Sequence, residues 1–73
     1  MIKIYGTTGC PACKQAVALC EAKDKEYLYI DMMEEPNMMD ALVSMIGPFR
    51  SVPQILVNEQ HVGGFEDLKD VLV

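Results

Sequence analysis

Cys10 and Cys13 lie three positions apart, with Pro11 and Ala12 between them, a spacing that suits thiol chemistry. Two thiols at this separation can close a reversible disulfide. A strand-like run precedes the pair and a helix-like stretch follows it, a context that indicates thiol redox chemistry ahead of a structural cross-link. We therefore predict that this dithiol is the reactive centre of the chain.

The two thiols are expected to have unequal roles. Cys10 precedes the first turn of the predicted helix, whereas Cys13 lies on its inward stripe. A free thiol, with a pKa of about 8.5, is only about 3% ionised at pH 7. The positive end of the helix stabilises an anion by roughly 0.3–1 kcal/mol, and the N–H groups of Ala12 and Cys13 can point at the sulfur. We predict that Cys10 is the nucleophile and Cys13 the resolving thiol.

Ser51-Val52-Pro53 is a second candidate element, just before a predicted strand. An X-Pro bond can be cis in a tight turn. If the Val52–Pro53 bond is cis and faces Cys10, the N–H and C=O of Val52 can pair with an extended substrate backbone as an added strand would. An ordinary trans proline at the start of a strand explains the same residues, and the sequence leaves both possibilities open.

The run Gly63-Gly64-Phe65-Glu66-Asp67 is a third candidate element. Its glycines let the backbone approach a ligand, and the N–H groups that open the following helix can bind a carboxylate. Asp67 could bind an ammonium group. The alternative is a tight turn followed by an acidic first helical turn.

Hydrophobic periodicity predicts the elements that position these residues. Strands are expected at 2–5, 27–30, 54–57 and 60–62, with Asn58-Glu59 as a two-residue hairpin turn between the last two. Helices are expected after Pro11, with a core-facing stripe of Cys13, Ala16, Val17 and Cys20; from residues 34–37, with a stripe of Met38, Met39, Leu42, Val43 and Ile46; and after Gly64, with Leu68, Val71 and Leu72. The order β-α-β-α-β-β-α predicts an α/β class and a thioredoxin-like fold, with a mixed four-stranded sheet and three helices.

Length and composition exclude several classes of protein. The 73 residues have room for one domain, 1–73, and contain no apolar run long enough to cross a membrane. The N-terminus lacks the pattern of a signal peptide, and three cysteines suit a reducing compartment, so a cytoplasmic protein is expected. A net charge of −5 argues against nucleic acid as a partner. We expect a monomer.

The chain resembles the glutaredoxins over essentially its whole length. The resemblance is carried by Ile4-Tyr5, Cys10-Pro11-Ala12-Cys13, Arg50-Ser51-Val52-Pro53-Gln54-Ile55 and His61-Val62-Gly63-Gly64-Phe65-Glu66-Asp67-Leu68. It implies glutathione as co-substrate, with Cys10 attacking a glutathione mixed disulfide. It further implies a set of glutathione contacts: the backbone at Val52, beside Pro53, for the cysteinyl unit; Gly64, Phe65, Glu66 and Asp67 for the γ-glutamyl end; Arg50 for a tripeptide carboxylate; and Tyr5 lining the site.

The leading hypothesis is a glutathione-dependent thiol-disulfide oxidoreductase. It would reduce protein disulfides, glutathione mixed disulfides or both, by Cys10 attack and Cys13 resolution. One alternative is a redoxin that donates electrons to ribonucleotide reductase and is recycled by thioredoxin reductase. It is motivated by Ala12 between the cysteines and by Thr7 or Thr8 where glutaredoxins often have a Lys shortly before the first cysteine. Others are a small C-x-x-C metal-binding module and an iron–sulfur cluster held by Cys10 and glutathione, which Pro11 disfavours. No metal is expected.

Other residues that could suggest chemistry are expected to be structural. Cys20 lies two helical turns beyond Cys13, too far for a disulfide, and is predicted to be a core residue. His61 has no second ligand nearby and is predicted to have a surface or turn role. The six methionines mostly fit the second helix and its loop and are predicted to fill the core.

Overall fold

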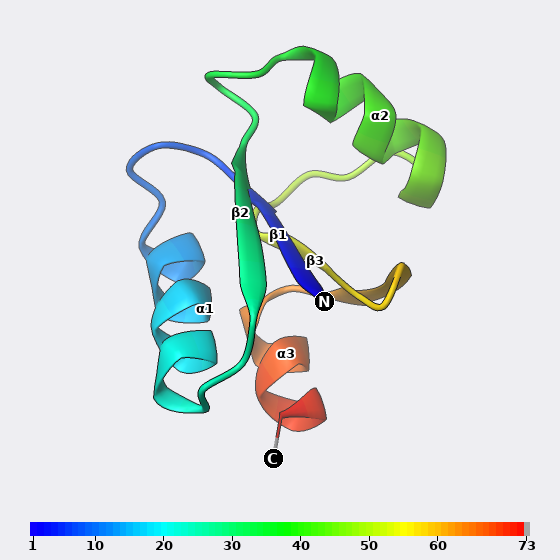
Figure 1. Ribbon diagram of the computed structural model, residues 1–73. Helices are drawn as coiled ribbons and strands as arrows, with labels where there is room; N and C mark the ends of the chain where they lie inside the picture. Colours follow the sequence, from blue (N-terminus) through cyan, green and yellow to red (C-terminus); the bar gives the residue numbers. More distant parts are fainter. Residues whose placement is uncertain (73) are drawn as a thin grey trace.

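A mixed four-stranded sheet with three helices forms the computed structural model, which describes residues 1–72 (Figure 1). The elements are β1 (Ile2–Gly6), α1 (Pro11–Ala22), β2 (Tyr27–Asp31), α2 (Asn37–Ile46), β3 (Gln54–Val57), β4 (Gln60–Gly63) and α3 (Phe65–Val71). The strand order is β2-β1-β3-β4; β1 runs parallel to β2 and antiparallel to β3, which pairs antiparallel with β4. The predicted element order and fold class are confirmed.

Alternation along β1 divides the core between the two faces of the sheet. Ile2 and Ile4 point toward α1 and α3, where they pack with Ile55 and Leu68. Tyr5 points the opposite way, into a cluster beneath α2 made with Met32, Leu42 and Leu56. Thus α1 and α3 cover one face, and α2 covers the other (Figure 1).

The predicted inward stripe of α1 is confirmed. Cys13, Ala16 and Cys20 are fully buried, and Val17 packs against the same cluster. Pro11 occupies the first turn, where its missing N–H costs no hydrogen bond. Cys20 is a free core cysteine, as predicted, and burial, followed by the charge of Glu21, raises the pKa of its thiol.

The predicted stripe of α2 is too wide. Leu42 is fully buried and Met38 and Ile46 pack beside it, but Met39 and Val43 are 43% and 38% exposed. Only one side of this helix meets the sheet, so residues at the margins of a five-residue stripe remain in solvent. The helix begins at Asn37; the N–H groups of residues 34 and 35 bond the Asp31 carbonyl in the preceding turn.

The prediction that the methionines fill the core is wrong for most of them. Met32 is buried and Met38 packs against the α2 cluster, as predicted. The other four are exposed: Met1, Met33, Met39 and Met45. Val71 of α3, also expected on an apolar face, is 50% exposed, because this short helix buries little beyond Leu68.

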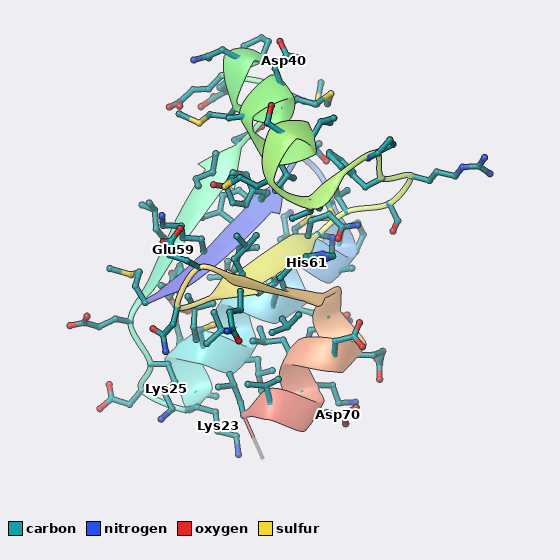
Figure 2. All side chains as sticks on the ribbon, turned by 90° about the vertical axis from the view of Figure 1, so that its right-hand side faces the viewer. Lys23, Lys25, Asp40, Glu59, His61 and Asp70 are labelled. Carbon is teal, nitrogen blue, oxygen red and sulfur yellow. A yellow bond between two sulfur atoms is a disulfide. The ribbon has the colours of Figure 1, made fainter. Side chains whose placement is uncertain are left out.

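The hairpin between β3 and β4 has the predicted two-residue turn. Asn58 and Glu59 have φ angles of 51° and 68°, the left-handed values that a tight hairpin requires at both positions. Charged side chains such as Lys23, Asp40 and Asp70 project from the periphery of the molecule (Figure 2). Within residues 1–72, no helix combines the length and apolar character needed to span a bilayer.

Candidate redox site

Cys10 and Cys13 lie where β1 leads into α1, at one end of the sheet. They form a disulfide, with their Cα atoms 5.2 Å apart. Cys10 is the N-cap of α1 in extended conformation, and the N–H of Lys14 bonds its carbonyl as the helix starts. The predicted dithiol is therefore positioned by a strand end and a helix start.

The two sulfur atoms have different environments. Cys10 is partly exposed, and its Sγ accepts a hydrogen bond from the N–H of Cys13 at 3.1 Å. Cys13 is fully buried. An incoming thiolate can reach Cys10 but not Cys13, and the helix start offers Cys10 an N–H donor in addition to its positive dipole.

Gly6, the last residue of β1, leaves the space that the buried sulfur occupies. A Cβ at this position would lie 2.5 Å from the Tyr29 hydroxyl and 2.7 Å from Cys13 Sγ, both too close for a real contact. Strands β1 and β2 and helix α1 thus come together at Gly6. This role of Gly6 was not predicted from the sequence, where the available signal was a glycine that ends the strand just before the cysteine loop.

The loop before β3 passes beside the dithiol. The carbonyl oxygen of Val52 lies 3.9 Å from Cys10 Sγ, and the Val52–Pro53 peptide bond is cis. Of the two possibilities that the sequence left open, the structure has the cis form facing Cys10. The Val52 backbone is therefore available to a chain whose sulfur meets Cys10.

A buried amide holds this loop. Gln54 is 9% exposed, and its Nε2 donates to the carbonyl of Ser51 at 2.8 Å. Its Oε1 is then left to accept from Nε2 of His61, also at 2.8 Å. His61 projects from β4 (Figure 2). The surface role predicted for His61 therefore includes fixing Gln54, which sequence reasoning did not single out.

A groove of about 420 Å³ runs beside Cys10, and we call it the Val52 groove. It is lined by Ala12 and Gln15 of α1, by residues 51–53, and by residues 64–67 at the start of α3. Most of the predicted glutathione contacts meet here: Val52, Pro53, Gly64, Phe65, Glu66 and Asp67.

The start of α3 is shaped around the Asp67 carboxylate. Asp67 Oδ2 accepts a hydrogen bond from the N–H of Gly64 at 3.0 Å. Gly63 has a φ of 126°, and a Cβ there would collide with the same carboxylate. The acidic first turn and the two glycines therefore form one unit, which leaves the other carboxylate oxygen of Asp67 open to a ligand.

Two of the predicted glutathione contacts, Tyr5 and Arg50, lie outside the Val52 groove. Tyr5 is 4% exposed beneath α2, because strand alternation turns it toward that face. Arg50 is exposed and lines a neighbouring groove with Met39, Val43 and Phe49; Ser51 and Val52 border both grooves.

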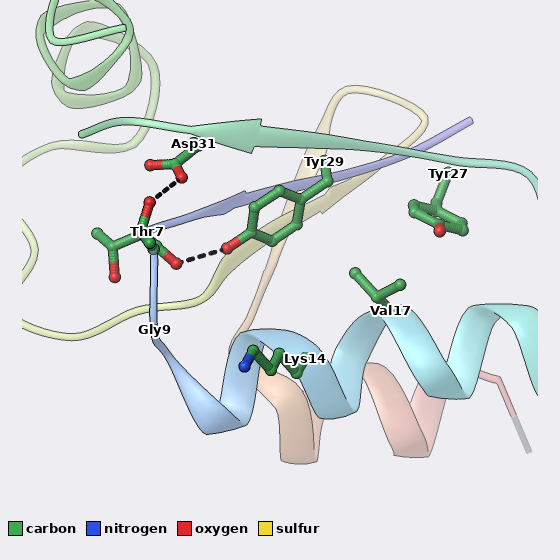
Figure 3. A pocket seen from close by; sticks show the side chains of 8 residues that line it. Thr7, Gly9, Lys14, Val17, Tyr27, Tyr29 and Asp31 are labelled. Atoms are coloured by element: carbon green, nitrogen blue, oxygen red, sulfur yellow. Dashed lines mark hydrogen bonds between the residues drawn. The ribbon is translucent and has the colours of Figure 1, made fainter. Parts of the chain in front are cut away.

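A third groove, of about 430 Å³, lies on the β2 side of the cysteine loop (Figure 3). Lys14 and Val17 of α1 face Tyr27 and Tyr29 of β2 across it. At its rim the hydroxyl of Thr8 donates to the Asp31 carboxylate. That hydrogen bond is the main reason that the pKa of Asp31 lies below its ordinary value, with further help from the N–H of Met33.

Thr8→Val is expected to destabilise the protein at neutral pH but not in strong acid. The pKa of Asp31 is lower in the folded than in the unfolded chain, so its stabilisation is complete above the unfolded value of about 3.9. It is lost as the pH falls through the folded value. Urea midpoints of Thr8→Val and the unsubstituted protein should therefore differ at pH 7 and converge as the pH falls through the folded value of Asp31.

Thr7→Val is the control, because among residues 1–72 the Thr7 hydroxyl makes no side-chain hydrogen bond, whereas its carbonyl accepts from Tyr29. A difference between Thr8→Val and the unsubstituted protein that does not shrink as the solution is acidified would contradict the link to Asp31.

Within residues 1–72, no three His, Cys, Asp or Glu side chains are grouped so that they could hold a metal ion.

Comparison with known proteins identifies related sequences. Residues 2–62 match the protein family described as Glutaredoxin. The chain is 39% identical over 70 residues to Glutaredoxin 1 of Escherichia coli, an alignment that covers 88% of this chain and 82% of that protein.

Solved structures show the same architecture. Reduced Escherichia coli glutaredoxin superimposes with a TM-score of 0.82 at 34% identity, covering 97% of this chain and 91% of that one. A buckwheat glutaredoxin–glutathione complex gives a TM-score of 0.80 at 22% identity, covering 94% of this chain and 64% of that one. At 22% identity, the similarity to the buckwheat protein shows a shared fold.

Proposed function

Since this chain belongs to the glutaredoxin family, we propose that glutathione is the co-substrate that reduces its Cys10–Cys13 pair. The family and the closed cysteine pair make the protein a thiol-disulfide oxidoreductase. Its substrates, in our proposal, are glutathione mixed disulfides and protein disulfides.

The observation that carries the proposal is the Val52 groove beside the accessible sulfur. Val52, whose carbonyl oxygen lies 3.9 Å from Cys10 Sγ, lines one part of it, and the start of α3 lines another. A volume of about 420 Å³ falls in the range of small-molecule sites. The buckwheat protein of the same fold has been solved with glutathione.

The groove offers complementary groups for an extended tripeptide. We assign the Val52 backbone to the cysteinyl unit, as a strand-like pairing. The N–H groups that open α3 suit the γ-glutamyl carboxylate, and Asp67 suits its ammonium group. Arg50, in the adjoining groove, suits the remaining carboxylate. Tyr5 is left out of this set because it is buried beneath α2.

The reaction is two successive exchanges. The Cys10 thiolate attacks the glutathione sulfur of a mixed disulfide, the substrate leaves as a thiolate, and Cys10 becomes glutathionylated. A second glutathione thiolate then attacks that glutathione sulfur, releasing glutathione disulfide and regenerating Cys10. With a protein disulfide, Cys13 attacks the Cys10 sulfur of the mixed disulfide, closes the Cys10–Cys13 bond and releases the substrate as a dithiol.

Turnover of a glutathionylated small disulfide with glutathione and glutathione reductase tests the proposal. We expect turnover in this mixture and none when glutathione is left out. A parallel assay replaces glutathione and its reductase with thioredoxin reductase. Turnover only in the second assay would overturn the proposal and favour the redoxin that serves ribonucleotide reductase.

Asp67→Asn is expected to weaken glutathione binding. Asparagine keeps an oxygen that can accept the Gly64 N–H but removes the charge that we assign to the γ-glutamyl ammonium. We expect KM for the glutathionylated substrate to rise about three- to tenfold with little change in kcat.

Asp70→Asn is the matched control, since Asp70 is exposed on the same helix and lies outside the groove. Equal effects of the two substitutions would show that net charge alone matters and would contradict the assignment of Asp67.

A further inference from the structure

The hydroxyl of Tyr29 and the buried sulfur of Cys13 both border the position that a Cβ on Gly6 would occupy. Tyr29 comes from β2 and reaches over the end of β1, where its hydroxyl donates to the Thr7 carbonyl at 2.8 Å (Figure 3). A methyl-sized position on Gly6 would touch this oxygen at 2.5 Å and Cys13 Sγ at 2.7 Å. The Tyr29 oxygen and the Cys13 sulfur therefore flank the same position, which stays open because residue 6 is a glycine.

Cys13 needs a hydrogen-bond donor when it resolves a mixed disulfide on Cys10. To resolve a mixed disulfide on Cys10, its thiol must first become a thiolate, yet the residue is fully buried. Burial disfavours the charged form of a thiol unless a donor replaces the lost water. Hydrogen bonds to charged groups are the most valuable ones in proteins.

Tyr29 is the donor that suits this position best. The other titratable groups on β1, α1 and β2 are engaged or placed elsewhere. They are Lys3, paired with Glu59; Tyr5, which faces α2; Lys14, which is exposed; Cys20, two turns further along α1; Glu21 and Tyr27, which bond each other; and Asp31, held by Thr8. Burial, followed by the charge of Asp31, raises the pKa of Tyr29, so its hydroxyl stays protonated and can donate at neutral pH. Its present acceptor, the carbonyl of the partly exposed Thr7, can take water instead.

We propose that the Tyr29 hydroxyl turns from the Thr7 carbonyl to Cys13 Sγ when that sulfur becomes a thiolate. The Cys13 proton leaves to solvent, the thiolate attacks Cys10 Sγ, the Cys10–Cys13 bond forms, and the substrate sulfur leaves with the electron pair. In the reverse direction the same hydrogen bond stabilises Cys13 as the leaving group. The inference rests on disulfide exchange itself and holds whichever thiol recycles the protein.

Stopped-flow mixing of the reduced protein with 5,5′-dithiobis(2-nitrobenzoate) resolves the reactions of Cys10 and Cys13 as two kinetic phases. Attack by Cys10 releases one coloured thiolate in a concentration-dependent phase, and resolution by Cys13 releases a second in a concentration-independent phase. Tyr29→Phe removes only the hydroxyl. The control is Tyr27→Phe, on the same strand and facing the same groove, whose hydroxyl instead bonds Glu21 at 2.9 Å.

We expect Tyr29→Phe to change only the second phase. Its pH profile should move about one unit upward, because the thiolate loses a donor. Intrinsic thiolate reactivity rises with basicity, which offsets part of the loss, so the second phase slows about three- to fourfold at pH 7 and becomes faster than in the unsubstituted protein at high pH. This crossover separates loss of a donor from a general loosening of the site.

A second phase whose pH profile is unchanged in Tyr29→Phe would overturn the inference, as would an equal change in Tyr27→Phe or an equal slowing of both phases. Absence of the first phase in the unsubstituted protein would instead contradict Cys10 as the nucleophile. The two failures are therefore distinguishable.

Discussion

Cys10→Ser is expected to abolish all disulfide exchange, whereas Cys13→Ser should retain reduction of glutathione mixed disulfides and lose reduction of protein disulfides. Cys10 is the accessible sulfur at the helix start, so nothing replaces it as the nucleophile. Cys13 is fully buried and acts only on a sulfur already bound to Cys10. A second glutathione can take over that resolving step for a small mixed disulfide, but not for a bound protein.

Turnover of a glutathionylated small substrate and of a protein disulfide, measured side by side, checks this division. Cys20→Ala is the control, because Cys20 is a free core cysteine and its removal leaves the dithiol intact. Equal loss of both activities in the Cys10 and Cys13 variants would show that the roles are wrongly assigned.

Gly6→Ala is expected to destabilise the fold by about 2–3 kcal/mol, a large effect for one methyl group. The new carbon would lie 2.5 Å from the Tyr29 hydroxyl and 2.7 Å from Cys13 Sγ. The tyrosine can swing away only by losing its bond to Thr7, and the sulfur belongs to a helical residue tied to Cys10. The urea midpoint of the oxidised protein measures the loss.

Gly64→Ala is the matched substitution for stability. The nearest atom to its added carbon is the Pro53 carbonyl oxygen at an ordinary 3.6 Å, and Gly64 has a φ of −99° that alanine adopts freely. We expect a change of under about 0.5 kcal/mol. If Gly6→Ala proves no more destabilising than Gly64→Ala, the close convergence at Gly6 is contradicted.

Local patterns in the sequence carried most of the fold. The cysteine spacing, the glycine-bounded strands and the 3.6-residue periodicity of α1 each depend on neighbours along the chain, and each is confirmed. Hydrophobic periodicity predicted less well how much of a helix surface is buried against the sheet. The width of the α2 stripe was misjudged because burial depends on how much of that helix meets the sheet, which the sequence does not state.

The site was predictable where one segment contains its own chemistry. Cys10 and Cys13 needed only each other and the helix start, and residues 64–67 needed only their turn. The contacts that cross between segments were missed. The Tyr29 hydroxyl and Cys13 Sγ border the same point at Gly6 only because β1 and β2 pair in a particular register, and Gln54 joins Ser51 to His61 across the hairpin.

Alkylation of the reduced protein by iodoacetamide at a series of pH values tests the central claim most directly, with each modified cysteine identified by peptide mass. Cys10 is expected to be modified first, and at pH 7 faster than a free cysteine peptide, because its thiolate accepts a hydrogen bond from the Cys13 N–H at the start of α1. A Cys10 that reacts no faster than the free peptide at neutral pH would contradict it.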